Sequence, residues 1–266
     1  MDLNKFRMQL TEAFKGIRFV EDGHKYYHGE QELLSCSRFY RRFLPDRQPL
    51  NKSQGQLDFS QPADLVAYAT QTSDPTAVLP SPLLDAAEQR RQAAMLHGTY
   101  IHKWIANYLT TTVLDSVPGD PEIHAFLGTW KVFQTYMTPL AIELVVGDPE
   151  LGLAGTIDLV LYNEEDKTVR LLDWKTGKSE LTYFNQNLRP PFARWGASAL
   201  NQYGIQLGIY ALILSRAFPE WKFGPPYLVH LRNDFSCYTY APPTVDMGRE
   251  IAGAVFDWLD EKDKMS

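Results

Sequence analysis

The most informative stretch of the sequence spans residues 155–178 and reads GTIDLVLYNEEDKTVRLLDWKTGK. Two runs rich in apolar and β-branched residues, 155–162 and 168–175, flank a polar segment at residues 163–167. Such runs on both sides of a short polar segment are typical of an antiparallel β-hairpin. We therefore expect two paired strands here, with a register that depends on the length of the turn between them.

Two carboxylates face each other if the turn of this hairpin consists of Glu165 and Asp166 alone. In that register Asp158 pairs with Asp173, and their Cβ atoms are ~5 Å apart. Lys175 shares a face with Asp173, because side chains alternate along a strand. Two carboxylates this close repel each other unless a cation lies between them. Oxygen ligands favour Mg²⁺ or Mn²⁺, so the pattern predicts a divalent-metal site with a lysine beside it.

An exposed ion pair is the simpler explanation of the same residues. An aspartate and a lysine two positions apart on a strand usually belong to a solvent-exposed face. The neighbours of Asp173 favour the metal site, because they form an apolar strand in which an unpaired charge is costly (Leu171, Leu172 and Trp174). Both interpretations stay open at this point.

The remaining sequence predicts an α/β core with additional elements at both ends. A serine–proline pair begins a long helix over residues 81–109. Before it, we expect a hairpin at residues 19–34, a short basic helix capped by Ser35 or Ser37, and an irregular proline-rich segment at residues 45–82. The other expected elements are helices at residues 122–137, 197–218 and 244–262, and strands at 140–146, 227–231 and 237–240.

Three polar residues on otherwise apolar helical faces are further candidates for a site. His102 shares a face with Ile105 and Leu109, by the three- to four-residue spacing of a helix. A histidine in such a position is more often a hydrogen-bonded core residue than a ligand, but it can also complete the coordination of a metal. Gln206 and Tyr210 lie one helical turn apart, and by themselves they fit polar residues at the boundary of a core.

Composition excludes several classes of protein. The chain has 266 residues, a net charge of −6 and 44% hydrophobic residues, which fits a globular protein and not a binder that coats nucleic acid through bulk positive charge. Its two cysteines, Cys36 and Cys237, rule out a four-cysteine zinc site or iron–sulfur cluster within this chain. The N-terminus does not resemble a signal peptide, and no apolar run approaches ~20 residues, so we expect a cytoplasmic protein without a membrane segment.

Four short motifs in a fixed order resemble the RecB-like branch of the PD-(D/E)XK nuclease superfamily. They are GTYIH at residues 98–102, GTID at 155–158, DWKTGK at 173–178 and QLGIY at 206–210. The resemblance implies a restriction-endonuclease-like core, with a central mixed sheet flanked by helices, in a nuclease domain at residues 81–266. Residues 1–80 then form an N-terminal extension, part of which resembles a segment found before this core in phage-encoded members.

The resemblance implies a Mg²⁺ or Mn²⁺ ion held by one histidine, two aspartates and one backbone carbonyl (His102, Asp158, Asp173 and Trp174). Lys175 then orients the attacking water and stabilises charge at the phosphate. Gln206 and Tyr210 are expected to support the active site and to contact the DNA backbone. Glu143 lies on the strand before the one that carries Asp158. It is expected either to bind a second metal ion or to lie next to the ligands of the first.

The chain is therefore expected to be a Mg²⁺- or Mn²⁺-dependent deoxyribonuclease that hydrolyses phosphodiester bonds. Without the four cysteines of iron–sulfur members, it lies nearer to the cluster-free exonucleases of phages and of mitochondrial maintenance. An exonuclease acting from DNA ends in phage or host recombination or repair is the leading hypothesis. The alternatives are a structure-selective endonuclease and a catalytically inactive DNA-binding subunit. No helicase P-loop motif is present, so unwinding would need a helicase or recombination partner.

Basic residues around these motifs are candidates for contacts with DNA (Arg41, Arg42, Lys178, Arg189 and Arg194). The segment at residues 183–195, YFNQNLRPPFARW, places aromatic residues among two of them. Bases stack on aromatic rings while arginines bind phosphates, an arrangement common in single-strand binding. An ordinary aromatic loop packed on the sheet fits this segment equally well, and a solvent-exposed helix face fits Arg41 and Arg42 slightly better.

Overall fold

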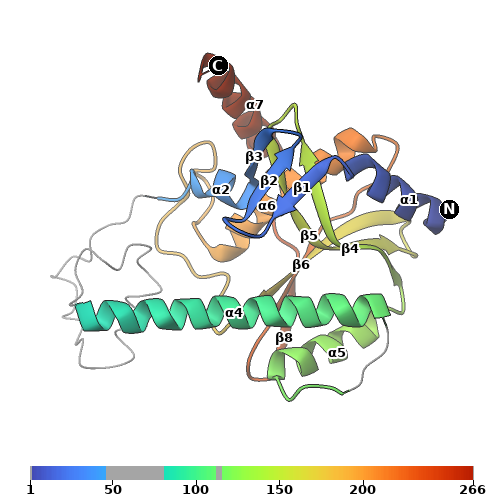
Figure 1. Ribbon diagram of the computed structural model, residues 1–266, viewed down its shortest axis with the longest axis vertical. Coiled ribbons are helices and arrows are strands. Elements are labelled where there is room, and N and C mark those ends of the chain that lie inside the picture. The colour runs from blue at the N-terminus through green and yellow to red at the C-terminus, as the bar shows by residue number, and fades with distance from the viewer. Residues whose placement is uncertain (1, 46–80, 112–115, 266) are drawn as a thin grey trace. The chain divides into compact units, whose positions relative to one another are not determined.

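The computed structural model describes residues 2–45, 81–111 and 116–265 (Figure 1). The chain divides into two compact units, one formed by Met1–Leu44 with Ile101–Ser266 and the other by Pro45–Tyr100. Of the second unit, the described residues are Pro45 and the part of helix α4 (Ser81–Thr111) that ends at Tyr100. Most of the predicted proline-rich segment lies outside the described residues, and the predicted domain boundary between residues 80 and 81 stays a prediction.

The chain begins with a helix and three antiparallel strands. Helix α1 (Leu3–Phe14) is capped by the Asp2 carboxylate, which accepts hydrogen bonds from two backbone N–H groups of the first turn. Strands β1 (Ile17–Val20), β2 (Lys25–His28) and β3 (Gln31–Ser35) pair in order. The predicted hairpin is confirmed with one strand more, whereas α1 was not predicted. Ser35, one of the two predicted caps, begins helix α2 (Cys36–Arg41).

The centre of the sheet is the hairpin formed by β5 (Leu153–Asn163) and β6 (Thr168–Thr176). Its ladder runs from Asn163 opposite Thr168 to Leu159 opposite Leu172. This is the predicted register, although the turn comprises residues 164–167 and not two residues alone. Adding one residue to each side of a turn keeps its centre, and therefore leaves the pairing of the strands unchanged.

The two edges of β5 have different partners. Strand β4 (Met137–Asp148) pairs antiparallel along one edge from end to end. On the other edge β3 pairs in parallel with Leu153 and Ala154, and β6 pairs with Leu159–Asn163. Residues 155–158 lie in the gap between these two partners. Beyond β6, the sheet continues with β7 (Tyr227–Leu231), which is parallel to β6, and β8 (Cys237–Tyr240), which is antiparallel to β7.

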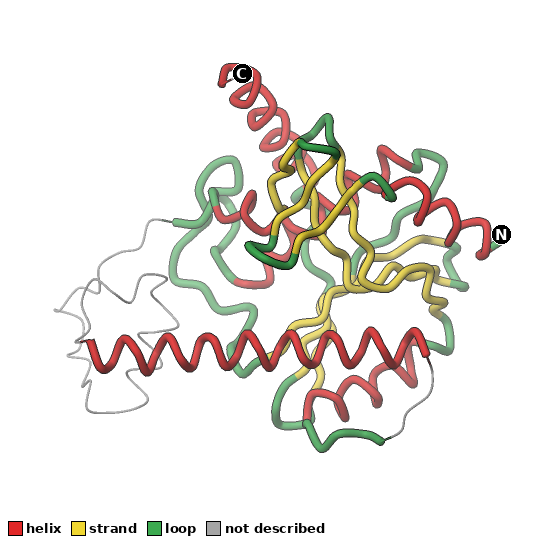
Figure 2. The backbone as a smooth tube through the Cα atoms, in the orientation of Figure 1, coloured by secondary structure: helices red, strands yellow, loops and turns green. Residues whose placement is uncertain are grey.

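A hydrophobic core lies on each face of this mixed sheet, and helices cover both sides (Figure 2). Val160 and Tyr162 of β5 belong to the core with α1, α2, α6 (Ala199–Ala217) and α7 (Gly248–Met265). Leu159 and Leu161 belong to the core with α5 (Pro121–Phe133) and the end of α4. Because both faces of β5 are buried, apolar residues follow one another along most of this strand. The predicted α/β fold, a central mixed sheet flanked by helices, is confirmed.

The predicted end of the helix before β4 is wrong. The helix expected at residues 122–137 ends at Phe133, and Met137 begins β4. Met137 is buried, so its apolar side chain fits a helical pattern and a strand pattern equally well. Pro139 therefore lies in a strand. The ladder tolerates it because the register shifts between Pro139 and Ala141, as at a β-bulge.

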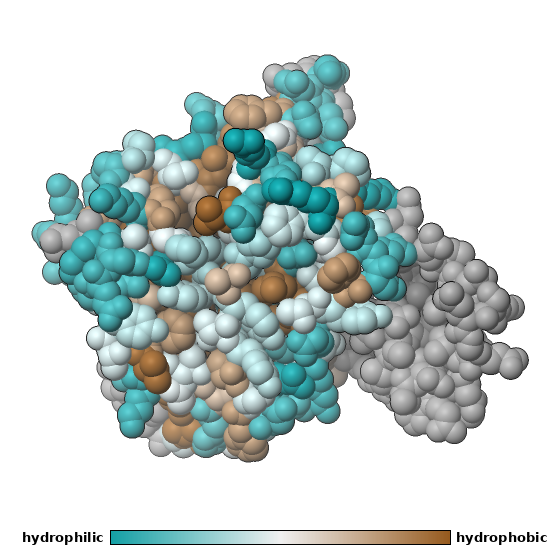
Figure 3. Space-filling view, turned by 180° about the vertical axis from the view of Figure 1, so that it is seen from behind, coloured by the Kyte–Doolittle hydropathy of each residue, from teal (hydrophilic) through white to brown (hydrophobic). Residues whose placement is uncertain are grey.

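The last helix begins at Gly248 and not at the predicted Thr244. The Thr244 hydroxyl donates a hydrogen bond of 3.1 Å to the carbonyl oxygen of Gly204, which ties it to α6. None of the helices within the described residues combines the length and the apolar character needed to cross a membrane. On the face shown in Figure 3, hydrophobic residues form small groups among hydrophilic ones, as is common for folded proteins.

Candidate active site

Asp158 and Asp173 lie where β5 and β6 stop pairing. The ladder ends at Leu159 and Leu172, and these two aspartates are the next residues on their strands. Both are buried, with 9% and 4% of their surfaces exposed. The Asp158 carboxylate accepts a hydrogen bond of 2.7 Å from the backbone N–H of Trp174. Two buried carboxylates therefore stand at the open end of the hairpin.

Helix α4 brings His102 to this pair. Ile101 and Ile105 are buried and fix the rotation of the helix about its axis. Nδ1 of His102 lies 3.4 Å from Oδ2 of Asp158. Burial opposes protonation of the imidazole, but the neighbouring Asp158 and Asp173 carboxylates outweigh it, so that the pKa of His102 is raised. The structure thus places the predicted histidine against the predicted aspartates.

Strand β4 contributes Glu143 from the other edge of β5. Its two neighbours in β4 pair with Leu159 and Ile157, so Glu143 lies across from Asp158. Its φ of 49° falls in the left-handed region. For a residue other than glycine this conformation costs on the order of 1–3 kcal/mol, and it is concentrated at functional sites. One ligand atom from each of His102, Glu143 and Asp158 lies within 4.8 Å of the others.

This donor set fits a divalent metal ion. One imidazole nitrogen and several carboxylate oxygens suit a hard cation such as Mg²⁺ or Mn²⁺. Desolvation by surrounding protein atoms and the charge of Asp158 raise the pKa of Glu143 to about 7, although its side chain reaches the surface. Burial, opposed by Lys175 and reinforced by Asp158, raises the pKa of Asp173 to about 6. Burial would also raise the pKa of Asp158, but His102 and Lys175 outweigh it and lower that pKa.

Lys175 lies between an acid and an aromatic ring. Its Nζ is 2.5 Å from Oδ2 of Asp173 and 4.4 Å from the centroid of the Tyr203 ring. Burial disfavours the ammonium, but Asp173 and Tyr203 outweigh it and raise the pKa of Lys175. Tyr203 was not predicted from the sequence. Its position three residues before Gln206 and seven before Tyr210 was the available signal, because this spacing places all three on one helical face.

Gln206 and Tyr210 form a hydrogen-bonded pair on α6. Nε2 of Gln206 donates to the Tyr210 hydroxyl at 2.9 Å, and Tyr210 is buried. The Tyr210 ring packs against Gly155, where an added Cβ would lie 2.5 Å from the hydroxyl oxygen. Gly155 is the first residue of the gap in β5, so the pair supports the segment that carries Asp158. The predicted contact of this pair with DNA stays a prediction.

The predicted DNA-binding residues lie at the end of α2 and in the segment between β6 and α6, and two of them form ion pairs with α7. Arg42 forms an ion pair with Glu261, and Arg194 forms one of 2.6 Å with Glu250. Both acids belong to α7. The remaining three are exposed (Arg41, Lys178 and Arg189). Contact of these five residues with DNA, and the Trp174 carbonyl as a metal ligand, stay predictions.

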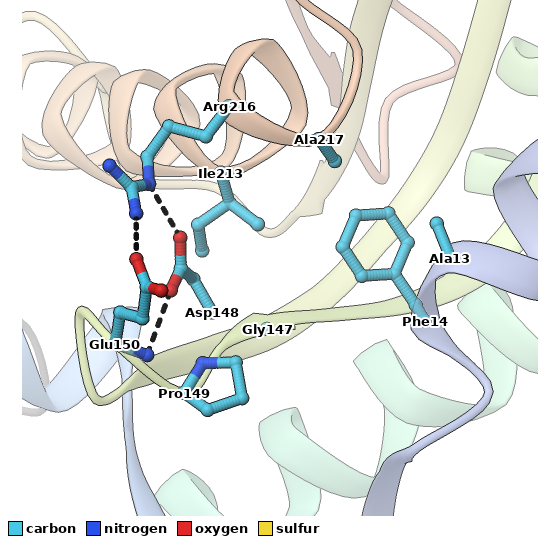
Figure 4. Close-up of a pocket in the computed structure, with 9 residues that line it drawn as sticks. All are labelled: Ala13, Phe14, Gly147, Asp148, Pro149, Glu150, Ile213, Arg216 and Ala217. Atoms are coloured by element: carbon cyan, nitrogen blue, oxygen red, sulfur yellow. Dashed lines mark hydrogen bonds and ion pairs between the residues drawn. The ribbon is translucent and has the colours of Figure 1, made fainter.

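A hollow in the same compact unit is separate from this cluster. It has a volume of about 580 Å³ and is lined by residues of α1, α6, the end of β4 and the connection from β4 to β5 (Figure 4). Its charged groups are already paired, since Arg216 lies 2.7 Å from Asp148 and 2.6 Å from Glu150. None of the candidate metal ligands lines it, so we assign it no catalytic role.

Comparison with known proteins agrees with this geometry. A family model described as the PD-(D/E)XK nuclease superfamily matches residues 81–234, more than half of the chain. The matched region includes His102, Glu143, Asp158, Asp173 and Lys175. No curated protein matches the chain. Nucleases of this superfamily use divalent metal ions. The chain therefore belongs to the PD-(D/E)XK nuclease superfamily and is, by that membership, a metal-dependent nuclease.

Proposed function

We propose that this protein is a Mg²⁺- or Mn²⁺-dependent deoxyribonuclease of the RecB-like branch, without an iron–sulfur cluster. One observation carries the proposal. His102 lies 3.4 Å from Asp158, at the open end of a hairpin that also holds Asp173 and Lys175. A histidine added to the aspartates and the lysine is the combination that distinguishes this branch in the motif resemblance. Two cysteines in the sequence are too few for a four-cysteine cluster within this chain.

The metal would be held by His102, Asp158 and Asp173 with the backbone carbonyl of Trp174, and Glu143 adds a further carboxylate. When bound, the ion stabilises negative charge on the phosphoryl oxygens and acidifies water. Asp158 is charged near neutral pH because its pKa is lowered. Asp173 and Glu143 have raised pKa values, so a bound cation favours their ionised forms and metal binding weakens as the pH falls below these values.

Lys175 supplies a positive charge of its own. Its raised pKa keeps the ammonium protonated at neutral pH, and the contact of 2.5 Å with Asp173 fixes its position. A fixed ammonium stabilises the charge that develops on the phosphate in the transition state, and it orients the attacking water. Gln206 and Tyr210 keep the Asp158 segment in place through their contact with Gly155.

The proposed activity is exonucleolytic, from DNA ends, in phage or host recombination or repair. The cluster-free motif set and the N-terminal segment that resembles phage-encoded members support this context. A structure-selective endonuclease is the alternative within the class, and a catalytically inactive DNA-binding subunit is the alternative outside it. The complete set of motif residues argues against the inactive subunit. A helicase or recombination protein would be the partner, and the host cytoplasm the compartment.

Cleavage of three substrates tests the proposal. End-labelled single-stranded DNA, end-labelled linear duplex and closed circular DNA are incubated with Mg²⁺, Mn²⁺ or EDTA. Lys175→Ala is the active-site variant, and Lys131→Ala, at an exposed position of α5, is the matched control. We expect metal-dependent loss of linear DNA with the wild type and with Lys131→Ala, while circles survive and Lys175→Ala is inactive.

Other outcomes would change the proposal in specific ways. Cutting of closed circles would replace the exonuclease by the endonuclease. DNA binding without cleavage of any substrate would favour the inactive subunit. Equal cleavage by Lys175→Ala and the wild type would contradict the assignment of the site itself.

A further inference from the structure

The loop between β6 and α6, residues 177–198, begins and ends beside the proposed catalytic lysine. Gly177 follows Lys175 by two residues. At the other end, Ser198 caps α6 by accepting a hydrogen bond from the backbone N–H of Asn201. Tyr203, in the following turn of α6, contacts Lys175. Both ends of this β6–α6 loop therefore lie beside the active site.

The β6–α6 loop has a fixed structure. The backbone N–H of Arg189 donates to the carbonyl of Phe43 at 2.7 Å. Nε2 of His230, a buried residue of β7, lies 2.9 Å from the carbonyl oxygen of Gly177. Three apolar side chains of the loop are part of the hydrophobic core (Leu181, Leu188 and Phe192). These contacts fix the loop from its first residue to its middle.

Two adjacent aromatic side chains of this fixed loop are nevertheless exposed. Tyr183 and Phe184 leave 64% and 52% of their surfaces accessible to solvent. The Phe184 ring lies over Gly196, where an added Cβ would be 2.4 Å from ring atoms. Gly196 therefore lets the ring rest on the backbone in one orientation. Two adjacent aromatic rings that are exposed on a packed segment are available for stacking against a flat ligand.

The charge of the loop suits a polyanion. Residues 177–198 contain three basic residues and one acidic residue, in a chain whose net charge is −6, and one of the basic residues, Arg194, is paired with Glu250. The acidic residue, Glu180, faces Arg232 at 3.9 Å. Lys178 is exposed near the start of the loop. Exposed aromatic rings within a locally positive surface are the combination that binds single-stranded nucleic acid.

We propose that Tyr183 and Phe184 form a stacking surface for the unpaired bases of a DNA strand that enters the active site. The inference rests on the proposed nuclease function, and it names single-stranded DNA as the form of substrate that this loop binds. The faces of bases within a duplex are covered by their neighbours, whereas the bases of a single strand can stack on aromatic rings. The aromatic segment at residues 183–195 thus has two roles. Phe192 packs in the core, whereas the exposed Tyr183 and Phe184 bind bases.

Equilibrium binding in EDTA tests this inference separately from catalysis. A fluorescein-labelled oligothymidylate and a blunt-ended DNA duplex of two strands are titrated with protein, and fluorescence anisotropy reports binding. The proteins are the wild type, Tyr183→Ala, Tyr183→Phe and Phe256→Ala. Phe256 is the matched control, because it is 66% exposed on α7. Tyr183 is preferred to Phe184 because Phe184 also packs on Gly196.

We expect the Kd for the single strand to rise about tenfold in Tyr183→Ala, as for the loss of one base–aromatic stack. Tyr183→Phe retains the ring, so its Kd should equal that of the wild type, as should that of Phe256→Ala. The Kd for the blunt duplex should be the same for all four proteins. Thermal unfolding of Tyr183→Ala should match the wild type, because most of the Tyr183 surface is exposed.

Three results would overturn the inference. They are an unchanged single-strand Kd in Tyr183→Ala, an equal loss of affinity for the blunt duplex, and a wild type that does not bind single strands. These results are independent of cleavage. A wild type that binds single strands through Tyr183 but cuts no DNA would overturn the proposed function and support the stacking surface. If the wild type cuts DNA and Tyr183→Ala binds single strands with the wild-type Kd, the stacking surface is overturned and the proposed function is supported.

Discussion

The two halves of the β5–β6 hairpin differ in what holds them together. In the paired half, Leu159 faces Leu172, both are fully buried, and backbone hydrogen bonds join the strands. In the open half, the next residues are Asp158 and Asp173, and a side-chain contact from Asp158 to the Trp174 N–H takes the place of the ladder. Burial stabilises the first half, whereas the second holds like charges that need a cation. Stability and chemistry thus rest on neighbouring residues of the same strands, and mutations should separate them.

The largest expected effect is on cleavage, from Asp158→Asn in the open half. Asparagine still accepts the hydrogen bond from Trp174, but it removes the charge that binds the metal. We expect cleavage at saturating Mg²⁺ to fall about 10³-fold, because charge stabilisation in the transition state is lost. Thermal unfolding in EDTA should show only a modest loss of stability, because the favourable contact of the Asp158 charge with His102 and Lys175 is lost while its repulsion with Asp173 and Glu143 is relieved. A variant that cuts at the wild-type rate would contradict this division of roles.

Leu172→Ala in the paired half should have the opposite outcome. The side chain is fully buried, and its truncation should lower the free energy of unfolding by about 2–5 kcal/mol. The rate of cleavage per folded molecule should stay unchanged at a temperature where the variant is folded. Urea unfolding gives the stability, and the same sample gives the rate. A large loss of rate with little loss of stability would mean that the two halves are not separable.

A smaller effect is expected at Tyr203, whose ring centroid lies 4.4 Å from Nζ of Lys175. Tyr203→Leu removes the ring and should lower kcat about fivefold, the size of one cation–π interaction, with KM unchanged. Tyr203→Phe keeps the ring and should retain the wild-type kcat. Equal loss in both variants would show that the hydroxyl, and not the ring, acts on Lys175.

The smallest effect is a pH dependence of stability that belongs to the open half. The pKa is raised to about 7 for Glu143 and to about 6 for Asp173. A raised carboxyl pKa stabilises the fold in acid, and this contribution is lost as the pH rises through 6 to 7. The raised pKa of His102 acts in the same direction. The lowered pKa of Asp158 acts in the opposite direction. Its contribution to the stability of the fold is already complete above pH 3.8, the ordinary pKa of an aspartate.

Metal-free protein should therefore lose stability between pH 5 and pH 8, and the rise in Tm on adding Mg²⁺ should be larger at pH 8. Thermal unfolding in EDTA and in Mg²⁺ at both pH values measures this. Glu143→Gln provides the control, because it should raise the Tm of metal-free protein more at pH 8 than at pH 5. A Mg²⁺-induced shift that is equal at both pH values would contradict the coupling.

The features that could be predicted from the sequence depend on residues that are close together along the chain. The register of the β5–β6 hairpin is set within one turn, and the longer turn kept the same centre. The missed helix α1 also carries a local signal, since its buried residues recur every four positions (Phe6, Leu10 and Phe14). Met137 was misassigned to a helix because a single buried apolar residue fits both the helical repeat and the two-residue repeat of a strand.

Features that depend on distant segments could not be predicted in this way. The left-handed φ of Glu143, which accompanies its position across from Asp158, has no signature in the sequence. The ion pairs of Arg42 with Glu261 and of Arg194 with Glu250 could not be predicted, because both glutamates lie on a helix far along the chain. Tertiary packing alone decides such pairs.

Titration of Mn²⁺ into metal-free protein, followed by a cleavage assay on the same samples, examines the site as a whole. The proteins are the wild type, Lys175→Ala and Asp158→Asn. The proposed site predicts that the wild type binds Mn²⁺ and cuts DNA, that Lys175→Ala binds Mn²⁺ but does not cut, and that Asp158→Asn does neither. Wild-type affinity for Mn²⁺ in Asp158→Asn, or cleavage by Lys175→Ala, would contradict it.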